Sequence, residues 1–272
     1  MWRLLLFLLS GSIWAQDGQQ AGRPGWPCVA GRAVDPAYLE TSESTGGQLF
    51  LFQKDEIAHA SLFMSASFTH PATVLRAVGN LAGTRDYEFP VDSTMESFLV
   101  MASLQCRNSI RVLRPNGAEL TAANSAQSVD LQAGRILRID FPEPGKWKVR
   151  LTGAGLFVLS VAAKTNIRLT NVSFFAVSGD RPRLVHPLFG VRQNLEAHLT
   201  GEVSAVRVQV LGPAGDVMAG GDVTEAPAKG DYGREITPAS ERFRIAVSGT
   251  DAVGWPFQRT DPVLFRAVPA TP

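Results

Sequence analysis

The residues most often used in catalysis are scattered along this sequence. Its four histidines are His59, His70, His186 and His198, and none has a second histidine or a cysteine at metal-ligand spacing. Isolated histidines of this kind are usually solvated or hydrogen-bonded once. No Gly-x-Ser-x-Gly sequence, which would form a nucleophile elbow, is present. These residues predict neither a metal centre nor a serine hydrolase.

Carboxylate pairs are the next candidates for chemistry. Asp140 and Glu143, and Glu225 and Asp231, lie close in sequence, and a glycosidase needs two carboxyl groups close in space. Nothing in the sequence places either pair at a cleft. We therefore predict no catalytic residue.

Three aspartates follow glycines between residues 212 and 233, a composition that suits calcium ligands. These are Asp216, Asp222 and Asp231. Their spacing fits neither an EF-hand loop nor the Gly-Gly-x-Gly-x-Asp repeat. A plain surface loop is the better interpretation, and we expect no metal and no cofactor.

Aromatic and arginine side chains are candidates for recognition of a partner. Trp255 lies in a Gly-Trp-Pro turn, where an aromatic ring would be exposed to a protein or a glycan, although a ring folded back onto the sheet is the favoured alternative. Arg259 is a second speculative contact. The preferred role for Arg259 is structural, in an ion pair with Asp251 or Asp261 that holds the last hairpin. Asn171 begins Asn-Val-Ser, a glycosylation acceptor pattern if the source is a eukaryote.

Residues 1–15 have the pattern of a secretory signal peptide, with Arg3, an apolar run from Leu4 to Leu9, and small residues at the exit. The apolar run is shorter than the ~20 residues of a membrane-spanning helix. We therefore expect a secreted protein that does not span a membrane. Residues 16–34, rich in Gln, Gly and Pro, are expected to be flexible.

The charges of the chain are balanced, with 26 Lys and Arg against 25 Asp and Glu. This balance gives no electrostatic case for binding nucleic acid or an anionic membrane. The expected partner is an extracellular protein or glycan, and the oligomeric state is left open.

Two cysteines, Cys28 and Cys106, follow the predicted signal peptide. An oxidising compartment would let them form a disulfide that ties the N-terminal segment to the first β domain. Two unrelated thiols are the alternative, because spacing alone does not give geometry.

The elements that would position these residues are mainly strands. Asp35 and Pro36 predict the start of a short helix that ends before Gly46 and Gly47. A strand over 49–52 and a second helix from Asp55 should follow, giving a helix–strand–helix segment at 35–66 that is too small to bury its own core. We expect it to pack on the first β domain, because Phe50 and its apolar neighbours would otherwise be exposed.

Period-two alternation then predicts two antiparallel β-sandwiches, at 80–165 and at 180–268, the second immunoglobulin- or fibronectin-like. Trp147 alternates with lysines and should face the first core. The strands expected in the first sandwich are 87–90, 97–104, 109–113, 136–141, 146–151 and 156–162. Those expected in the second are 183–187, 193–199, 205–211, 234–236, 242–248 and 262–268.

Three stretches together resemble the hemicentins and related extracellular proteins that carry a von Willebrand factor A domain. They are DPAYLETSESTGGQLFLFQKDEI at 35–57, the segments FPVDSTMESFLVMASL, SIRVLRPNG and FPEPGKWKVRLTGAGLFVLSVAA within 89–162, and RFRIAVSGTDAVGWPFQRTDPVLF at 242–265. By this resemblance, 35–66 would be the remnant of the end of an A domain. The Asp-x-Ser-x-Ser metal loop of the family is missing, so its metal-dependent binding is not expected here.

The sequence thus predicts a secreted, non-enzymatic adhesion or extracellular-matrix protein that recognises its partner through β-sandwich surfaces. Exposed loop residues would supply the contacts, and the strand at 49–52 is a candidate for pairing with a partner strand. The alternative is a carbohydrate-binding or accessory module of a secreted system.

Overall fold

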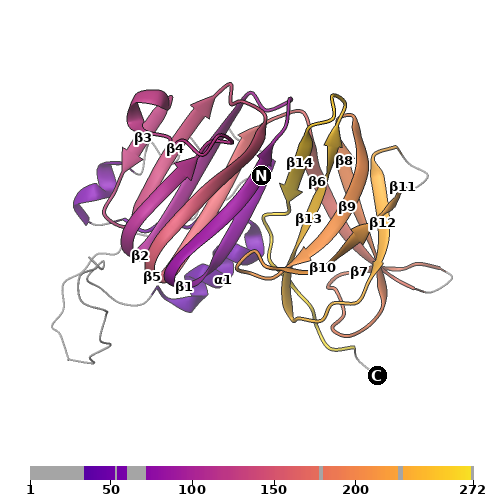
Figure 1. Cartoon of the computed structure of the whole chain (residues 1–272). Coiled ribbons are helices and arrows are strands. Elements are labelled where there is room, and N and C mark those ends of the chain that lie inside the picture. Colours follow the sequence, from indigo (N-terminus) through magenta and orange to yellow (C-terminus); the bar gives the residue numbers. More distant parts are fainter. Residues whose placement is uncertain (1–33, 53, 60–71, 178–179, 226–228, 271–272) are drawn as a thin grey trace.

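Two β units lie side by side in the computed structural model, which describes residues 34–52, 54–59, 72–177, 180–225 and 229–270 (Figure 1). One five-stranded antiparallel sheet builds the first unit, and two sheets build the second. The predicted mainly β, sandwich-like class is confirmed. None of the helices among these residues is long and apolar enough to cross a membrane.

The sheet of the first unit has the strand order β1-β5-β2-β4-β3. Three of its strands are unusually long. Its strands are β1 (Ala72–Val91), β2 (Ser97–Leu113), β3 (Gln127–Asp130), β4 (Gly134–Asp140) and β5 (Gly145–Lys164), with a 3₁₀ turn, η2 (Ala122–Asn124), before β3.

This single sheet folds over on itself and so makes its own sandwich. Phe98 pairs across β2 and β5 with Ala163, sixteen residues after Trp147 on the same strand. In a straight strand these positions would be ~50 Å apart. The rings of Phe98 and Trp147 nevertheless meet edge to face, with centroids 5.0 Å apart. Trp147 is fully buried in this core, as its alternation with lysines predicts.

Glycines make the fold-over possible. Gly83 of β1 lies opposite Gly153 of β5, and both have positive φ, +114° and +156°. The predicted turn at 153–155 is therefore a bend inside one continuous strand, and the two strands expected at 146–151 and 156–162 are both parts of β5. In the same way β2 contains both 97–104 and 109–113, with shifts in pairing register between them.

Residues 34–52 cover the outer face of the sheet. Helix α1 (Pro36–Thr45) begins at the Asp35 cap, whose carboxylate accepts the Ala37 amide, and ends at Gly46 with φ +68°, as predicted. Residues 49–52 are buried, and Phe50 and Phe52 pack on Leu99 and Met101. This confirms the expected packing for the described part of 35–66.

One expectation for this segment is wrong, and a second is met only in part. Residues 49–52 form no strand, and because they are buried they offer no edge to a partner. The helix expected from Asp55 is a 3₁₀ helix, η1 (Lys54–His59), and its predicted continuation lies outside the described residues.

The second unit is a sandwich of two antiparallel sheets, β10-β9-β13-β14 with β15 beside β13, and β11-β12-β8-β6-β7. This division of strands resembles that of immunoglobulin-like sandwiches. Its strands are β6 (Arg168–Ala176), β7 (Arg183–Leu184), β8 (Gln193–Thr200), β9 (Val203–Leu211), β10 (Val217–Asp222), β11 (Thr224–Glu225), β12 (Asp231–Ile236), β13 (Arg242–Asp251), β14 (Pro256–Thr260) and β15 (Phe265–Arg266).

The boundary between the two units lies earlier in the sequence than the composition predicts. β6 pairs with β8, so residues 168–176 belong to the second unit and precede the expected start at 180. The first unit likewise begins at Ala72 and not near residue 80. Strand β6 was not predicted, because polar residues interrupt its alternation of apolar side chains. Of the strand expected over 262–268, only the short β15 is present, and β14 precedes it.

The bend at Gly153 gives a direct test of this fold. A Cβ at position 153 would lie 2.2 Å from the Cys106 carbonyl oxygen, whereas one at Gly83 would meet nothing within 4 Å. We expect Gly83→Ala to cost about 1–2 kcal/mol of unfolding free energy through backbone strain alone, and Gly153→Ala clearly more, because a clash is added. Urea denaturation measures both. Equal losses for the two variants would contradict the close approach of β5 to β2.

Candidate functional site

The functional candidates gather where the two units meet, and buried charges hold this junction together. Arg259 of β14 is fully buried and donates to Asp92 Oδ2 at 2.7 Å, in the turn between β1 and β2. The same guanidinium donates to Thr165 Oγ1 at 2.9 Å and to the Ile167 carbonyl at 2.7 Å. Burial lowers the pKa of Arg259, and the charge and hydrogen bond of Asp92 oppose that shift. These bonds join one unit to the other through a desolvated ion pair.

Glu43 of α1 makes a second buried connection. Its carboxylate accepts from Arg76 Nη2 of β1 at 2.7 Å and also from Arg244 of β13. Its carbonyl oxygen accepts the Leu264 amide at 2.8 Å. One carboxylate thus sits between a guanidinium from each unit, and α1 links the units.

A turn of the second unit also rests on β1. The Val78 amide donates to the Pro213 carbonyl at 2.8 Å, and a Cβ added to Gly79 would lie 3.2 Å from Ala214. At the edge of this contact Arg85 donates to Asp216 at 2.5 Å, in a more exposed pair. Apolar contact, backbone hydrogen bonds and buried charge all resist movement between the units.

The hairpin tip, residues 251–256 between β13 and β14, is the exposed feature that this junction supports. Asp251 Oδ1 accepts the amides of Val253 at 3.0 Å and Trp255 at 2.8 Å. Its Oδ2 accepts from the Ser93 amide at 2.9 Å and from the Ser93 hydroxyl at 2.6 Å, in the first unit. Burial alone would raise the pKa of Asp251, but these four hydrogen bonds lower it below its ordinary value.

Trp255 is therefore an exposed aromatic on a fixed loop. Its side chain is 42% exposed and that of Val253 is 73% exposed. Of the two alternatives for Trp255, the structure has the exposed one. A ring held by a loop with little freedom loses little entropy when a partner covers it.

A groove of about 450 Å³ begins beside the hairpin tip and runs between the units. Pro256 and Phe257 line it from the second unit, together with Arg207. Glu88 and Lys146 line it from the first unit and pair with each other at 3.2 Å. The groove combines an apolar floor with charged edges.

Arg259 departs from the prediction of a surface contact. It is buried, and its ion pair is with Asp92 and not with Asp251 or Asp261. The preferred structural role is right in kind, but the partner comes from the other unit. The sequence could not indicate this pair, because Asp92 and Arg259 are far apart in the chain and come together only when the two units pack against each other.

Five of the carboxylates that suggested chemistry are occupied in separate surface contacts, and the side chain of the sixth, Glu225, lies outside the described residues. Asp140 pairs with Arg138, Glu143 with Arg114, Asp216 with Arg85, Asp222 with Arg207 and Asp231 with His198. The His198–Asp231 pair lies across β8 and β12 at 2.5 Å, a register contact that spacing in the sequence did not reveal. Within the described ranges, no group of three or more metal-ligating side chains occurs.

Two further predicted sites concern modification. Asn171 is exposed on β6, and its side-chain amide donates to the hydroxyl of Ser173, the third residue of the acceptor pattern, at 3.0 Å. Cys106 lies in β2 beside a register shift, whereas Cys28 lies outside the described residues. The pairing of Cys28 with Cys106 stays a prediction.

Comparison with known proteins bears on the first unit. The family model described as hemicentin galactose-binding domain-like matches residues 71–166, the span of β1 to β5. The chain is also 22% identical to mouse Hemicentin-1 (Mus musculus) over 250 residues, which cover 85% of this chain and 4% of that protein. The chain thus spans a small part of this relative, and the two matches support a hemicentin-like relationship.

Similarity to solved structures is weak. A DUF4785 family protein from Legionella pneumophila has a TM-score of 0.37 at 13% identity, covering 75% of this chain and 67% of that one. A Bifidobacterium dentium β-glucuronidase has a TM-score of 0.25 at 10% identity, covering 68% and 40%. Neither similarity bears on function.

The Asp251 network predicts how the hairpin tip responds to mutation and to acid. Asp251→Asn replaces one of the two accepting carboxylate oxygens with an NH₂ group, which donates hydrogen bonds and does not accept them. We therefore expect faster hydrogen exchange at the Val253 and Trp255 backbone amides at pH 7. Because the pKa of Asp251 is lowered on folding, its stabilisation is present above the unfolded value of about 3.9 and is lost as the pH falls through the lower folded value. Exchange rates unchanged by the substitution would contradict a carboxylate-held loop.

Proposed function

We propose that this protein is a secreted, non-enzymatic recognition protein of the extracellular matrix or cell surface, which binds a protein partner through the hairpin tip and the adjoining groove. The observation that carries the proposal is the exposed Trp255 on a loop anchored to both units. Large aromatics at the centre of an interface commonly supply much of its binding energy.

The hemicentin-like similarity of the first unit supports an extracellular setting. The signal-peptide pattern of residues 1–15 supports the same setting. Within this proposal, residues 35–66 are a remnant of a von Willebrand A domain, of which helix α1 joins the two units. Cys28 and Cys106 pair, and Asn171 carries a glycan if the source is a eukaryote.

The arrangement of polar groups supports binding over catalysis. Among the described residues, Asp140, Glu143 and Asp231 each pair with a different side chain in separate places at the surface, and the buried Glu43 and Asp92 join the two units. General acid–base catalysis needs two such groups aimed at one position in a cleft. Recognition of a partner through an exposed aromatic side chain on a fixed loop does not need two such groups.

Trp255→Ala tests the proposal. We expect the purified protein to be retained on immobilised extracellular matrix, and the variant to lose at least about 30-fold in apparent affinity, the factor that corresponds to a hot-spot loss of 2 kcal/mol. Its melting temperature should stay within a few degrees of the wild type, because the hydrogen bonds of Asp251, and not the ring, hold the hairpin tip. Surface plasmon resonance on matrix extract measures the first quantity and calorimetry the second.

Val185→Ala is the matched control, since Val185 is a 91% exposed apolar residue outside the hairpin tip. It should bind as the wild type does. Retention of full binding by Trp255→Ala, or an equal loss in both variants, would remove the hairpin tip from the proposed interface.

A further inference from the structure

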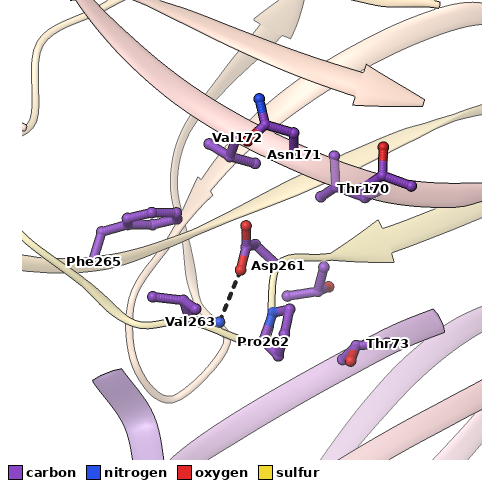
Figure 2. A pocket seen from close by; sticks show the side chains of 10 residues that line it. Thr73, Thr170, Asn171, Val172, Asp261, Pro262, Val263 and Phe265 are labelled. Atoms are coloured by element: carbon purple, nitrogen blue, oxygen red, sulfur yellow. Dashed lines mark hydrogen bonds between the residues drawn. The ribbon is translucent and has the colours of Figure 1, made fainter. Parts of the chain in front are cut away.

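A cavity of about 380 Å³ opens where β1 of the first unit meets β6 and the segment 260–265 of the second (Figure 2). It shares no lining residue with the groove beside the hairpin tip. Polar groups and apolar walls alternate around it. This combination of a few fixed polar groups with apolar surface is typical of small-molecule sites.

Asp261 provides a carboxylate in this cavity that is only half satisfied. One oxygen accepts the Val263 amide at 2.9 Å, the bond drawn in Figure 2. Among the described residues, no group hydrogen-bonds to the other oxygen. Burial raises the pKa of Asp261 to about 6, whereas the Val263 amide and the charge of Arg244 act in the opposite direction. The carboxylate is therefore ionised at pH 7.5 at some cost to stability, and a ligand hydroxyl would offset part of that cost.

Thr73 supplies the second, independent observation. Its side chain lines the cavity and is 4% exposed, and its Oγ1 has no hydrogen-bond partner within the described residues. A buried hydroxyl without a partner destabilises the folded protein, because its hydrogen bonds to water are lost and not replaced. A polar ligand in the cavity would satisfy the open oxygen of Asp261, and it would also satisfy the Thr73 hydroxyl once that side chain turns to meet it.

The rim and walls limit the kind of ligand. Thr170 and Asn171 are exposed on β6 and bring a hydroxyl and an amide to the opening. Phe265 and Val263 give apolar surface against which the C–H face of a ring can pack. Acceptors and donors at several positions around an apolar wall suit a compact ring with many hydroxyl groups.

The charged groups around the cavity favour a neutral ligand over an ion. The Asp261 carboxylate repels an anion. The guanidinium of Arg244, which donates to the Pro262 carbonyl at 2.5 Å, already provides positive charge behind Asp261 and disfavours a second cation.

We propose that this cavity binds one neutral pyranose residue of a glycan, with Asp261 and Thr73 hydrogen-bonded to its hydroxyls. The inference goes beyond the proposed function, because the hairpin tip contributes no residue to the cavity. Protein recognition through Trp255 and sugar binding here can therefore succeed or fail separately.

Amide chemical-shift titration tests the proposal with methyl glycosides of galactose, glucose and mannose. The full chain produced in bacteria is used, so that Asn171 carries no glycan. At millimolar concentrations, we expect saturable shifts at 169–172, 261 and 263–265 with at least one glycoside, and a loss of affinity of about tenfold or more in Asp261→Asn and in Thr73→Val. Trp255→Ala should bind the sugar as the wild type does.

Folding of the key variant has its own readout. Because the pKa of Asp261 is raised on folding, this carboxyl destabilises the protein increasingly as the pH rises from the unfolded value of about 3.9 to about 6, and fully at pH 7.5. Asp261→Asn should therefore melt at the same or a higher temperature at pH 7.5. Saturable shifts that persist equally in Asp261→Asn, no saturable shift with any glycoside, or preferential binding of lysine or arginine methyl ester would each overturn the proposal.

Discussion

Three buried arginines at the junction determine how this protein is built. Arg76, Arg244 and Arg259 are each fully buried, and each reaches a carboxylate from another part of the chain. A guanidinium out of water is costly unless it is paired and hydrogen-bonded, and removing one partner leaves the other charge stranded. The two units and α1 are consequently bound to a single relative position. The fixed hairpin tip, the groove and the Asp261 cavity all depend on that position.

Local features of the fold could be predicted because they depend on neighbouring residues. Asp35 and Pro36 start α1 and Gly46 ends it, and the alternation around Trp147 puts that ring in the core. The apolar content of 49–52 correctly implied burial. The strand predicted from the same apolar content is wrong, because these residues pack on the face of the sheet and do not pair with its edge.

The junction could not be predicted, for a physical reason. Arg259 and Asp92 are separated by 167 residues, and no periodicity links them. A turn signal such as Gly153-Ala154-Gly155 is equally compatible with the end of a strand and with a bend inside one. Only the closure of the sheet, in which Phe98 meets Trp147, decides between them. For the same reason the sequence favoured a Trp255 ring folded back onto the sheet, whereas its exposure depends on an anchor, Ser93, in the other unit.

The claim that buried charges make the two units one body is tested most directly by scanning calorimetry of the wild type and Arg259→Met. We expect the wild type to unfold in one transition, with equal calorimetric and van't Hoff enthalpies. Arg259→Met, which strands Asp92, should lose about 3–5 kcal/mol or divide into two transitions. Two separate transitions in the wild type, unchanged by the substitution, would contradict the account.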